Sequence, residues 1–356
     1  MILAGDVGGT KTVLAICDDA LAIVREAVYP CADYPSLEAI LDEFVSPDER
    51  RALTAACFGV AGPVVAGTAK ITNLPWTIDA GVLAGRLGGI PVTLLNDLQA
   101  TALGTLVLPD TAFAVLQPAA DGTAAETAPT IAVIAPGTGL GEALLVAGGA
   151  HYRALPSEGG HADFAAGTDD EIELLRYLRG VHGDHISYER VLSGAGIGDL
   201  YDFVRKATGA AEPAWLTEQL VPPGFPRAKE SRGPHPAIDP LPSVVAGDRN
   251  AVISRAALDG RDPTCVRALE MFAEILGAEA GNLALRGLAT GGVVIGGGIP
   301  PKILPALQHR RLIDRFNAKG RFARWTRTLS VRVALEPRAA LFGAAHHASP
   351  HKDARS

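Results

Sequence analysis

Residues 2–17 read ILAGDVGGTKTVLAIC, two apolar runs joined by a glycine-rich turn. The second run is β-branched and apolar, so the pattern predicts a strand, a turn and a second strand. Glycine lets a backbone approach a ligand closely, and consecutive N–H groups in such a turn form an anion-binding concavity. Asp6 adds a carboxylate and Thr10 a hydroxyl. The stretch therefore predicts either a phosphate site or an ordinary β-hairpin with a glycine turn.

Two familiar phosphate motifs do not fit this stretch. A P-loop needs four residues between its first glycine and the Gly-Lys-Ser/Thr group, and a helix must follow it. A dinucleotide-binding fingerprint also opens a helix. Here an apolar strand follows the turn. Other segments of the chain are therefore needed to distinguish an ordinary hairpin from a phosphate site.

Length and composition predict a packed α/β protein of two domains. The 356 residues exceed the size at which single cores stop growing, and 48% of them are hydrophobic against 20% charged. The net charge is −7, and Lys and Arg are scattered along the chain, which argues against a nucleic-acid partner. The four cysteines are far apart and form no CxxC pair, so we expect buried free thiols.

The sequence carries no sign of a membrane or a secretory route. It begins directly with the strand-like residues 2–4, and no run of about 18 apolar residues follows. We therefore expect a cytoplasmic protein with no membrane partner.

The opening pattern occurs a second time. Residues 131–146 again read as an apolar strand, a Gly/Thr turn at 137–141 and an apolar strand. Strands and longer connections alternate through 13–17, 22–29, 36–44 and 55–60, the pattern typical of α/β proteins. Two such hairpins fit a duplicated α/β scaffold that clamps one phosphorylated ligand between its halves.

Other segments are predicted by periodicity and by breakers. Proline and glycine crowd residues 213–242, so we expect a surface insertion without helix there. We expect loops at 118–129 and 351–356, helices at 169–180, 195–207, 250–258 and 264–286, a strand at 292–295, and a third glycine turn at 296–298.

Asp97 is the leading candidate for a general base. The β-branched strand 91–95 runs into Asn96 and Asp97, and open α/β sheets place ligands at such carboxyl ends. A hydroxyl nucleophile needs a carboxylate within hydrogen-bond reach to take its proton. The alternative is a helix N-cap, because residues 98–103 are helix formers.

A second polar group lies at Glu158 and His161, three residues apart around two glycines. Both could bind sugar hydroxyls, whereas a zinc site would need at least one further ligand nearby. A solvated loop histidine is the simpler alternative for His161. Glu189 stands beside Arg190, and spacing alone favours a surface pair of these two.

Six segments in order closely resemble the bacterial glucokinases of the hexokinase, actin and Hsp70 superfamily. The resemblance implies phosphorylation of the glucose 6-hydroxyl by ATP in a cleft between two ribonuclease-H-like α/β domains of the actin-like ATPase fold. It further implies a smaller domain of residues 1–108 plus 336–356, a larger one of 109–335, and a homodimer. The matching segments are 5–10, 96–97, 137–141, 158–164, 189–194 and 292–299.

The resemblance assigns roles residue by residue. Asp97 aligns with the catalytic base, and Asp6 with the carboxylate that positions Mg²⁺, through water. The glucose contacts align with Asn96, Asp97, Glu158, His161 and Glu189. The ATP contacts align with Gly5, Asp6, Val7, Gly8, Gly9, Thr10, Gly137, Thr138, Gly139, Gly296, Gly297 and Gly298.

Two other functions remain as alternatives. Lys11 stands where many glucokinases of this type carry Asn, and it is more familiar from ROK sugar kinases, which act on hexoses such as mannose or N-acetylglucosamine. However, ROK kinases generally carry a cysteine cluster that binds zinc, and this chain has no cysteine between Cys57 and Cys265. A DNA-binding regulator of the same fold would carry a helix-turn-helix before the first turn, which here begins at residue 5.

Overall fold

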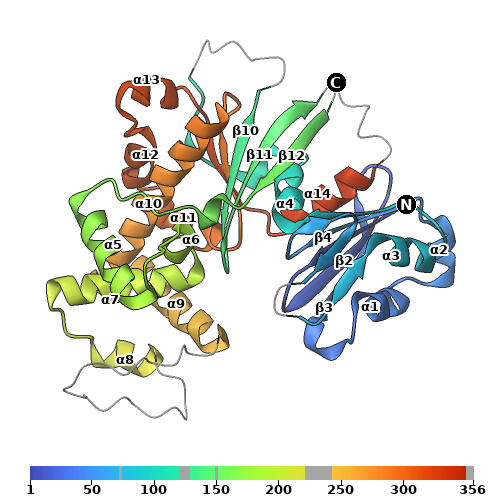
Figure 1. Cartoon of the computed structure of the whole chain (residues 1–356), viewed down its shortest axis with the longest axis horizontal. Coiled ribbons are helices and arrows are strands. Elements are labelled where there is room, and N and C mark those ends of the chain that lie inside the picture. Colours follow the sequence, from blue (N-terminus) through green and yellow to red (C-terminus); the bar gives the residue numbers. More distant parts are fainter. Residues whose placement is uncertain (72–73, 121–128, 149–150, 221–242, 350–356) are drawn as a thin grey trace.

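The computed structural model describes residues 1–71, 74–120, 129–148, 151–220 and 243–349, and two sheets with helices between and around them form its framework (Figure 1). The first sheet has the order β3-β2-β1-β4-β8. β1 runs antiparallel to β2 and parallel to β4, which confirms the predicted strand–turn–strand. Its strands are β1 (Ile2–Val7), β2 (Lys11–Cys17), β3 (Ile23–Pro30), β4 (Ala55–Val60) and β8 (Val92–Asn96).

The second sheet repeats this pattern, as the sequence predicts. β10 runs antiparallel to β11 and parallel to β13, in the order β12-β11-β10-β13-β14-β9. Its strands are β9 (Phe113–Gln117), β10 (Ile131–Pro136), β11 (Leu140–Gly148), β12 (His151–Ser157), β13 (Val293–Ile295) and β14 (Val331–Ala334). A small third sheet holds β5 (Val64–Val65), β6 (Thr68–Lys70) and β7 (Thr77–Asp79).

Helices α4 (Asp97–Gly104) and α14 (Ala339–Ala348) lie between the two sheets and contact each other closely (Figure 1). A Cβ at Gly104 would overlap the carbonyl oxygen of Ala339, and a Cβ at Gly343 would overlap that of Ala100. Only glycine allows two backbones this close. The helix pair therefore joins the first sheet to the second, although α14 lies far from α4 in the sequence.

Side chains of the second sheet alternate between two helical layers. Ala132 and Ile134 pack in one cluster with α10 (Pro263–Gly287), whereas Val133 packs in another with α4 and α14. This is the period of two expected for a strand that is covered on both faces. On the first sheet, α1 (Leu37–Phe44) and α3 (Ala80–Arg86) cover the face opposite α4 and α14.

The remaining helices lie on the side of the second sheet away from α4 and α14, except α2, which belongs to the first half (Figure 1). None of the helices in the described ranges combines the length and apolarity that crossing a bilayer requires. The bounds are α2 (Pro47–Ala52), α5 (Asp169–His182), α6 (Tyr188–Val191), α7 (Gly194–Thr208), α8 (Ala214–Leu220), α9 (Ser243–Leu258), α11 (Leu304–Leu307), α12 (Arg310–Asn317) and α13 (Ala323–Thr326). Single 3₁₀ turns occupy Cys31–Asp33, Asp110–Ala112, Gly159–His161, Pro300–Ile303 and Gly320–Phe322.

The expectation that residues 213–242 contain no helix is wrong at their start. Helix α8 begins directly after Pro213, whose carbonyl accepts hydrogen bonds from the N–H groups of Leu216 and Thr217. Proline is tolerated where a helix begins, because the first N–H groups have no partner within the helix. Residues 221–242, like 121–128 and 351–356, lie outside the described part of the chain.

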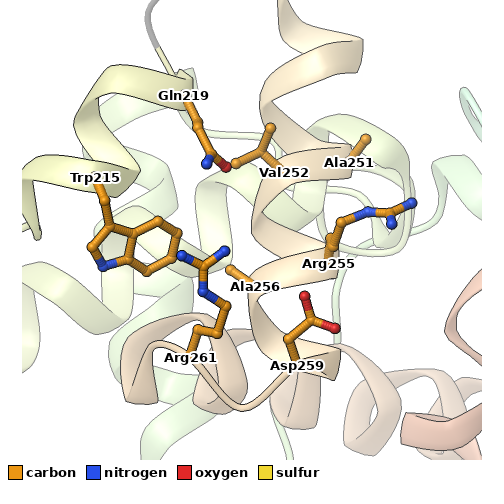
Figure 2. Close-up of a pocket in the computed structure, with 8 residues that line it drawn as sticks. All are labelled: Trp215, Gln219, Ala251, Val252, Arg255, Ala256, Asp259 and Arg261. Atoms are coloured by element: carbon orange, nitrogen blue, oxygen red, sulfur yellow. The ribbon is translucent and has the colours of Figure 1, made fainter.

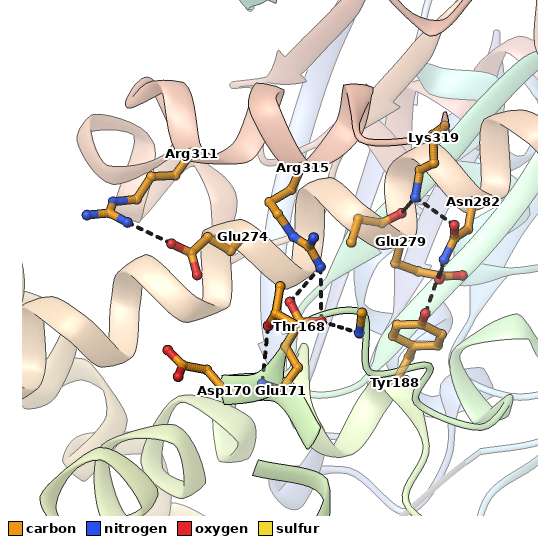
Figure 3. A network of polar contacts seen from close by, with 12 residues as sticks. Thr168, Asp170, Glu171, Tyr188, Glu274, Glu279, Asn282, Arg311, Arg315 and Lys319 are labelled. Atoms are coloured by element: carbon orange, nitrogen blue, oxygen red, sulfur yellow. Dashed lines mark hydrogen bonds and ion pairs between the residues drawn. The ribbon is translucent and has the colours of Figure 1, made fainter. Parts of the chain in front are cut away.

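Charged side chains connect α10 with α12 and the start of α5 (Figure 3). Arg315 bonds both carboxylate oxygens of the buried Glu171, at 2.7 and 2.9 Å. The ammonium group of Lys319 donates to the carbonyl of Ala278 and to Oδ1 of Asn282, each at 2.7 Å. Burial, followed by the charge of Arg315, lowers the pKa of Lys319 to about 8.

Lys319 should therefore make stability depend on pH. Its folded pKa lies below the ordinary lysine value of 10.5, so the unfolded chain binds more protons between about pH 8 and 10.5. The contribution of Lys319 then rises as pH rises through this window. We expect Lys319→Met to reduce the gain in unfolding free energy between pH 7.5 and 9.5, as measured by urea titration. Lys302→Met, at an exposed lysine, is the control and should reproduce the wild-type gain.

Candidate active site

The first glycine turn connects β1 to β2. Gly8 donates its N–H to the carbonyl of Lys11 at 3.0 Å, which closes the hairpin tightly. Gly5 and Val7 lie within β1 itself: Val7 is buried, and a Cβ at Gly5 would overlap the Phe58 ring. These two residues thus serve packing, and the turn at residues 8–10 is the part that can meet a ligand.

Asp97 lies close enough to Asp6 to influence the ionisation of Asp6. Burial, followed by the charge of Asp97, raises the pKa of Asp6 to about 6, and Lys11 acts in the opposite direction. Burial is also the largest cause of the raised pKa of Asp97, and the charge of Glu158 adds to it. Three carboxylates from separate segments therefore surround one region, where a cation or a hydroxyl would be favoured.

The end of β8 separates the capping role from the role of Asp97. Asn96 is the N-cap of α4: its Oδ1 accepts from the N–H of Leu98 at 3.0 Å, and its own N–H donates to Oε1 of Gln99 at 3.1 Å. Asp97 comes one residue later, at the first helical position, and its Oδ1 also accepts from Leu98 at 2.8 Å. The N-cap alternative therefore applies to Asn96, and Asp97 is free of that requirement.

His161 lies between two other predicted sugar ligands, Glu158 and Glu189. Its Nε2 is 3.8 Å from Oε2 of Glu158, and its Nδ1 is 4.0 Å from Oε1 of Glu189. The second oxygen of Glu189 accepts from the N–H of Leu140 at 3.0 Å. Glu189 thus faces the second glycine turn and His161, where spacing alone favoured a surface pair with Arg190. The structure thus brings together Glu158 and His161, which share one tight turn, and Glu189, which lies 28 residues later in the sequence.

The second and third glycine turns pack against one another. Gly137 donates to the carbonyl of Gly139 at 2.8 Å, and Gly296 donates to the carbonyl of Ile134, also at 2.8 Å. Gly297 has a φ of 87°, and a Cβ there would overlap the carbonyl oxygen of Pro136. The exposed Thr138 and Gly298 therefore lie on adjoining turns at the carboxyl ends of β10 and β13.

Two glycines bring β4 and the second glycine turn against the helix that carries Asp97. A Cβ at Gly141 would overlap the side chain of Leu98, and a Cβ at Gly59 would lie 2.8 Å from Cβ of Ala100 and 3.8 Å from Cα of Asp97. The start of α4 is therefore enclosed by β4 on one side and by the second turn on the other.

The described residues contain no cluster of three or more His, Cys, Asp or Glu side chains arranged to hold a metal ion. Magnesium is different, because it keeps several waters and needs only one or two carboxylates. Asp6 beside Asp97 is such a pair, and a cation would relieve the repulsion that helps to raise the pKa of Asp6.

The cavity in Figure 2, about 300 Å³ in volume, lies elsewhere, between α8 and α9. Trp215, Arg255 and Asp259 line it, and the guanidinium of Arg261 stacks over the Trp215 ring at 4.1 Å. Its lining includes none of the residues from the three glycine turns or from the Glu158 and Glu189 segments. This cavity is therefore separate from the candidate site.

Sequence reasoning missed the buried charges behind the site. Glu142, in β11, and Glu279, in α10, are both buried, and Arg286 lies against both carboxylates. The sequence did contain an indication of Glu142, because this residue interrupts an otherwise apolar strand of residues 140–147. A charge at such a position indicates a buried partner.

Known proteins of one family match this chain along its length. A family model described as Glucokinase matches residues 3–351. The glucokinase of Nostoc punctiforme is 39% identical over 350 residues, which cover 97% of this chain and 98% of that protein. The crystal structure of a glucokinase from an Antarctic psychrotroph is 30% identical, covers 98% of both chains and has a TM-score of 0.78.

A ROK family glucokinase from Streptomyces griseus, solved with glucose and AMPPNP, has a TM-score of 0.60 at 21% identity and shares the fold. It covers 98% of both chains. These likenesses confirm the expected actin-like ATPase fold of two α/β units. With the model match and the Nostoc relative, they establish that the chain belongs to the glucokinase family.

Proposed function

We propose that this protein transfers the γ-phosphoryl group of ATP to the 6-hydroxyl of glucose, with Asp97 as the general base. The observation that carries the proposal is the position of Asp97 at the first residue of α4, which β4 and the second glycine turn enclose. The charge of Asp97 raises the pKa of Asp6, and the charge of Glu158 raises that of Asp97. A base placed between a phosphate turn and a sugar cluster can take the hydroxyl proton as the new P–O bond forms.

Asn96, Glu158, His161 and Glu189 are proposed to hold the other sugar hydroxyls. Carboxylates accept hydrogen bonds from hydroxyls, while the amide and imidazole can donate as well as accept. The spacing of 3.8 to 4.0 Å between His161 and the two carboxylates leaves room for hydroxyls to bond several of these groups. Such polar groups would discriminate among sugars by the hydroxyls they satisfy.

ATP is proposed to bind across the three glycine turns. Residues 8–10 and 137–139, with the hydroxyls of Thr10 and Thr138, would hold the phosphates, and Gly296, Gly297 and Gly298 would face adenosine. Phosphoryl transfer depends mostly on positioning and charge neutralisation, which backbone N–H groups supply. Support comes from the packing of the second and third turns at one edge of the second sheet.

Asp6 is proposed to hold Mg²⁺ through water. When bound, the ion would neutralise phosphate charge. The residues present fit this role, because Asp6 is a partly buried carboxylate within the electrostatic reach of a second one, Asp97. Closure of the two halves on sugar would exclude water from this region.

Three further expectations are part of the proposal. The smaller domain comprises residues 1–108 plus 336–356 and the larger one 109–335, in agreement with the membership of the two sheets. The homodimer and the cytoplasmic location stay predictions from the resemblance and from the sequence.

Phosphorylation of mannose or N-acetylglucosamine was the alternative. The relative at 39% identity is named a glucokinase, and so is the structure at 30% identity, which favours glucose. A coupled assay that compares kcat/KM for these sugars with ATP and Mg²⁺ tests the proposal. We expect glucose to have the highest value, and a higher value for another hexose would contradict it.

The sugar contacts can be tested at Glu189. Glu189→Gln keeps an oxygen for the N–H of Leu140 but removes the charge, so we expect the KM for glucose to rise about 10- to 100-fold. The KM for ATP should stay unchanged in the same assay. Glu218→Gln, at an exposed glutamate of α8, is the matched control and should leave both values unchanged.

A further inference from the structure

Glu142 is a buried carboxylate next to the proposed sugar site. It lies in β11, five residues after Gly137, and its side chain is 1% exposed. No hydrogen-bond partner within the described residues meets its Oε1 atom. Oε2 lies 3.7 Å from Nη2 of Arg286, which also bonds Glu279. Since burying a charge is costly, such a residue requires a reason.

The turn that carries Glu158 and His161 packs directly on this carboxylate. A Cβ at Gly159 would overlap Oε2 of Glu142, and a Cβ at Gly160 would overlap the carbonyl oxygen of Leu140. Neither glycine has a φ in the left-handed region, so close approach alone accounts for their lack of a side chain. The position of this turn is therefore set by what lies beneath it in β11.

The same charges also reach the segment of Glu189. Nδ2 of Asn282 donates to Oε2 of Glu279 at 2.9 Å and to the hydroxyl of Tyr188 at 3.1 Å (Figure 3). Tyr188 directly precedes Glu189 and donates its N–H to the carbonyl of Ala162. One network thus supports both segments that carry the proposed sugar ligands.

We propose that Glu142, held by Arg286, is a positioning residue. It fixes the position of the turn at residues 157–161 relative to β11, and thereby the affinity for sugar. The inference rests on the proposed sugar contacts of Glu158 and His161. Glu142 itself lies beneath the turn, so its loss should change sugar affinity and leave the chemical step intact.

A double-mutant cycle between Glu142 and Gly159 tests the proposal. Gly159→Ala adds a Cβ that Glu142 must make room for, so we expect a higher KM for glucose with kcat and the KM for ATP within about twofold. In the Glu142→Ala background the overlap with Glu142 is gone, and the one other close contact of this Cβ is with the rotatable Ser157 hydroxyl, at 2.9 Å. The effects on the KM for glucose should therefore be non-additive by about fivefold or more.

Gly160→Ala is the matched control. Its Cβ would meet the Leu140 backbone, which Glu142→Ala does not remove, so its effect should be the same in both backgrounds. Glu142→Gln, of equal size, provides a second variant if Gly159→Ala fails to fold: it should raise the KM for glucose while kcat is kept. A lower melting temperature with an unchanged KM for glucose in the Glu142 variants would overturn the positioning role.

Failure of the proposed function gives a different result. If Glu158→Gln and His161→Gln leave the KM for glucose unchanged, the sugar does not bind at this turn and both proposals fail. If these two variants raise it and the Glu142 variants do not, the sugar contacts stand and the positioning role alone is wrong.

Discussion

Asp97→Asn should lower kcat by about 10²- to 10⁴-fold, which is the usual contribution of one general base. The amide has nearly the shape of the carboxylate and can still accept from the N–H of Leu98, so α4 should begin as before. It cannot take the proton of the sugar hydroxyl. Initial rates at saturating glucose and ATP, in an assay coupled to glucose 6-phosphate, measure the loss.

The control for this variant is the helix cap one residue earlier. Asn96→Asp keeps a capping oxygen for Leu98 and leaves Asp97 in place. Because Asn96 is itself a proposed sugar contact, the KM for glucose should rise, while kcat at saturating glucose should fall far less than in Asp97→Asn. Melting temperatures of both variants show whether the fold is kept. A folded Asp97→Asn protein that turns over at nearly the wild-type rate would remove Asp97 from its assigned role.

Gly343→Ala should cause the largest loss of stability among single methyl additions. The new Cβ would meet the backbone carbonyl of Ala100 and the backbone nitrogen of Gly104, and backbone cannot move aside as a side chain does. The two helices must separate, at a cost of about 3 kcal/mol, at the upper end for overpacked cores. Urea unfolding followed by far-ultraviolet circular dichroism measures this cost.

The same substitution at Gly85 serves as its control. Gly85 lies in α3, is exposed, and has no atom within 4 Å of an added Cβ. Alanine there should stabilise by about 0.5–1 kcal/mol, because glycine weakens a helix interior. Equal stability losses in the two variants would show that the helix crossing does not depend on a missing side chain.

Local patterns predicted the parts of the fold that depend on neighbouring residues. The strand–turn–strand at 2–17 and its repeat at 131–146 were confirmed because apolar β-branched runs around glycine have few other solutions. The position of Asp97 at the end of a strand could also be predicted from the sequence. Its proximity to Asp6 and Glu158 could not, because periodicity along the chain says nothing about distances between separate segments.

Long-range packing could not be predicted in this way. Helix α14 has no sequence feature that directs it to α4, because the reason is the shape of the glycine contact between two distant segments. Glu142 was overlooked for a similar reason: its partner Arg286, which also pairs with Glu279, comes from a helix more than a hundred residues later. The prediction of no helix after Pro213 was wrong because composition alone does not distinguish a proline that begins a helix from one that ends it.

The place of α14 between the sheets also bears on how the chain folds as it is synthesised. Ala4, Ala15 and Cys57 form a face of the first sheet that α14 covers, yet residues 339–348 leave the ribosome only after the whole second sheet has been made. Proteins generally fold from the N-terminal part first as they emerge. The part of that face which α14 covers therefore has no partner until the end of synthesis, and the helix that carries Asp97 gains its contact with α14 last.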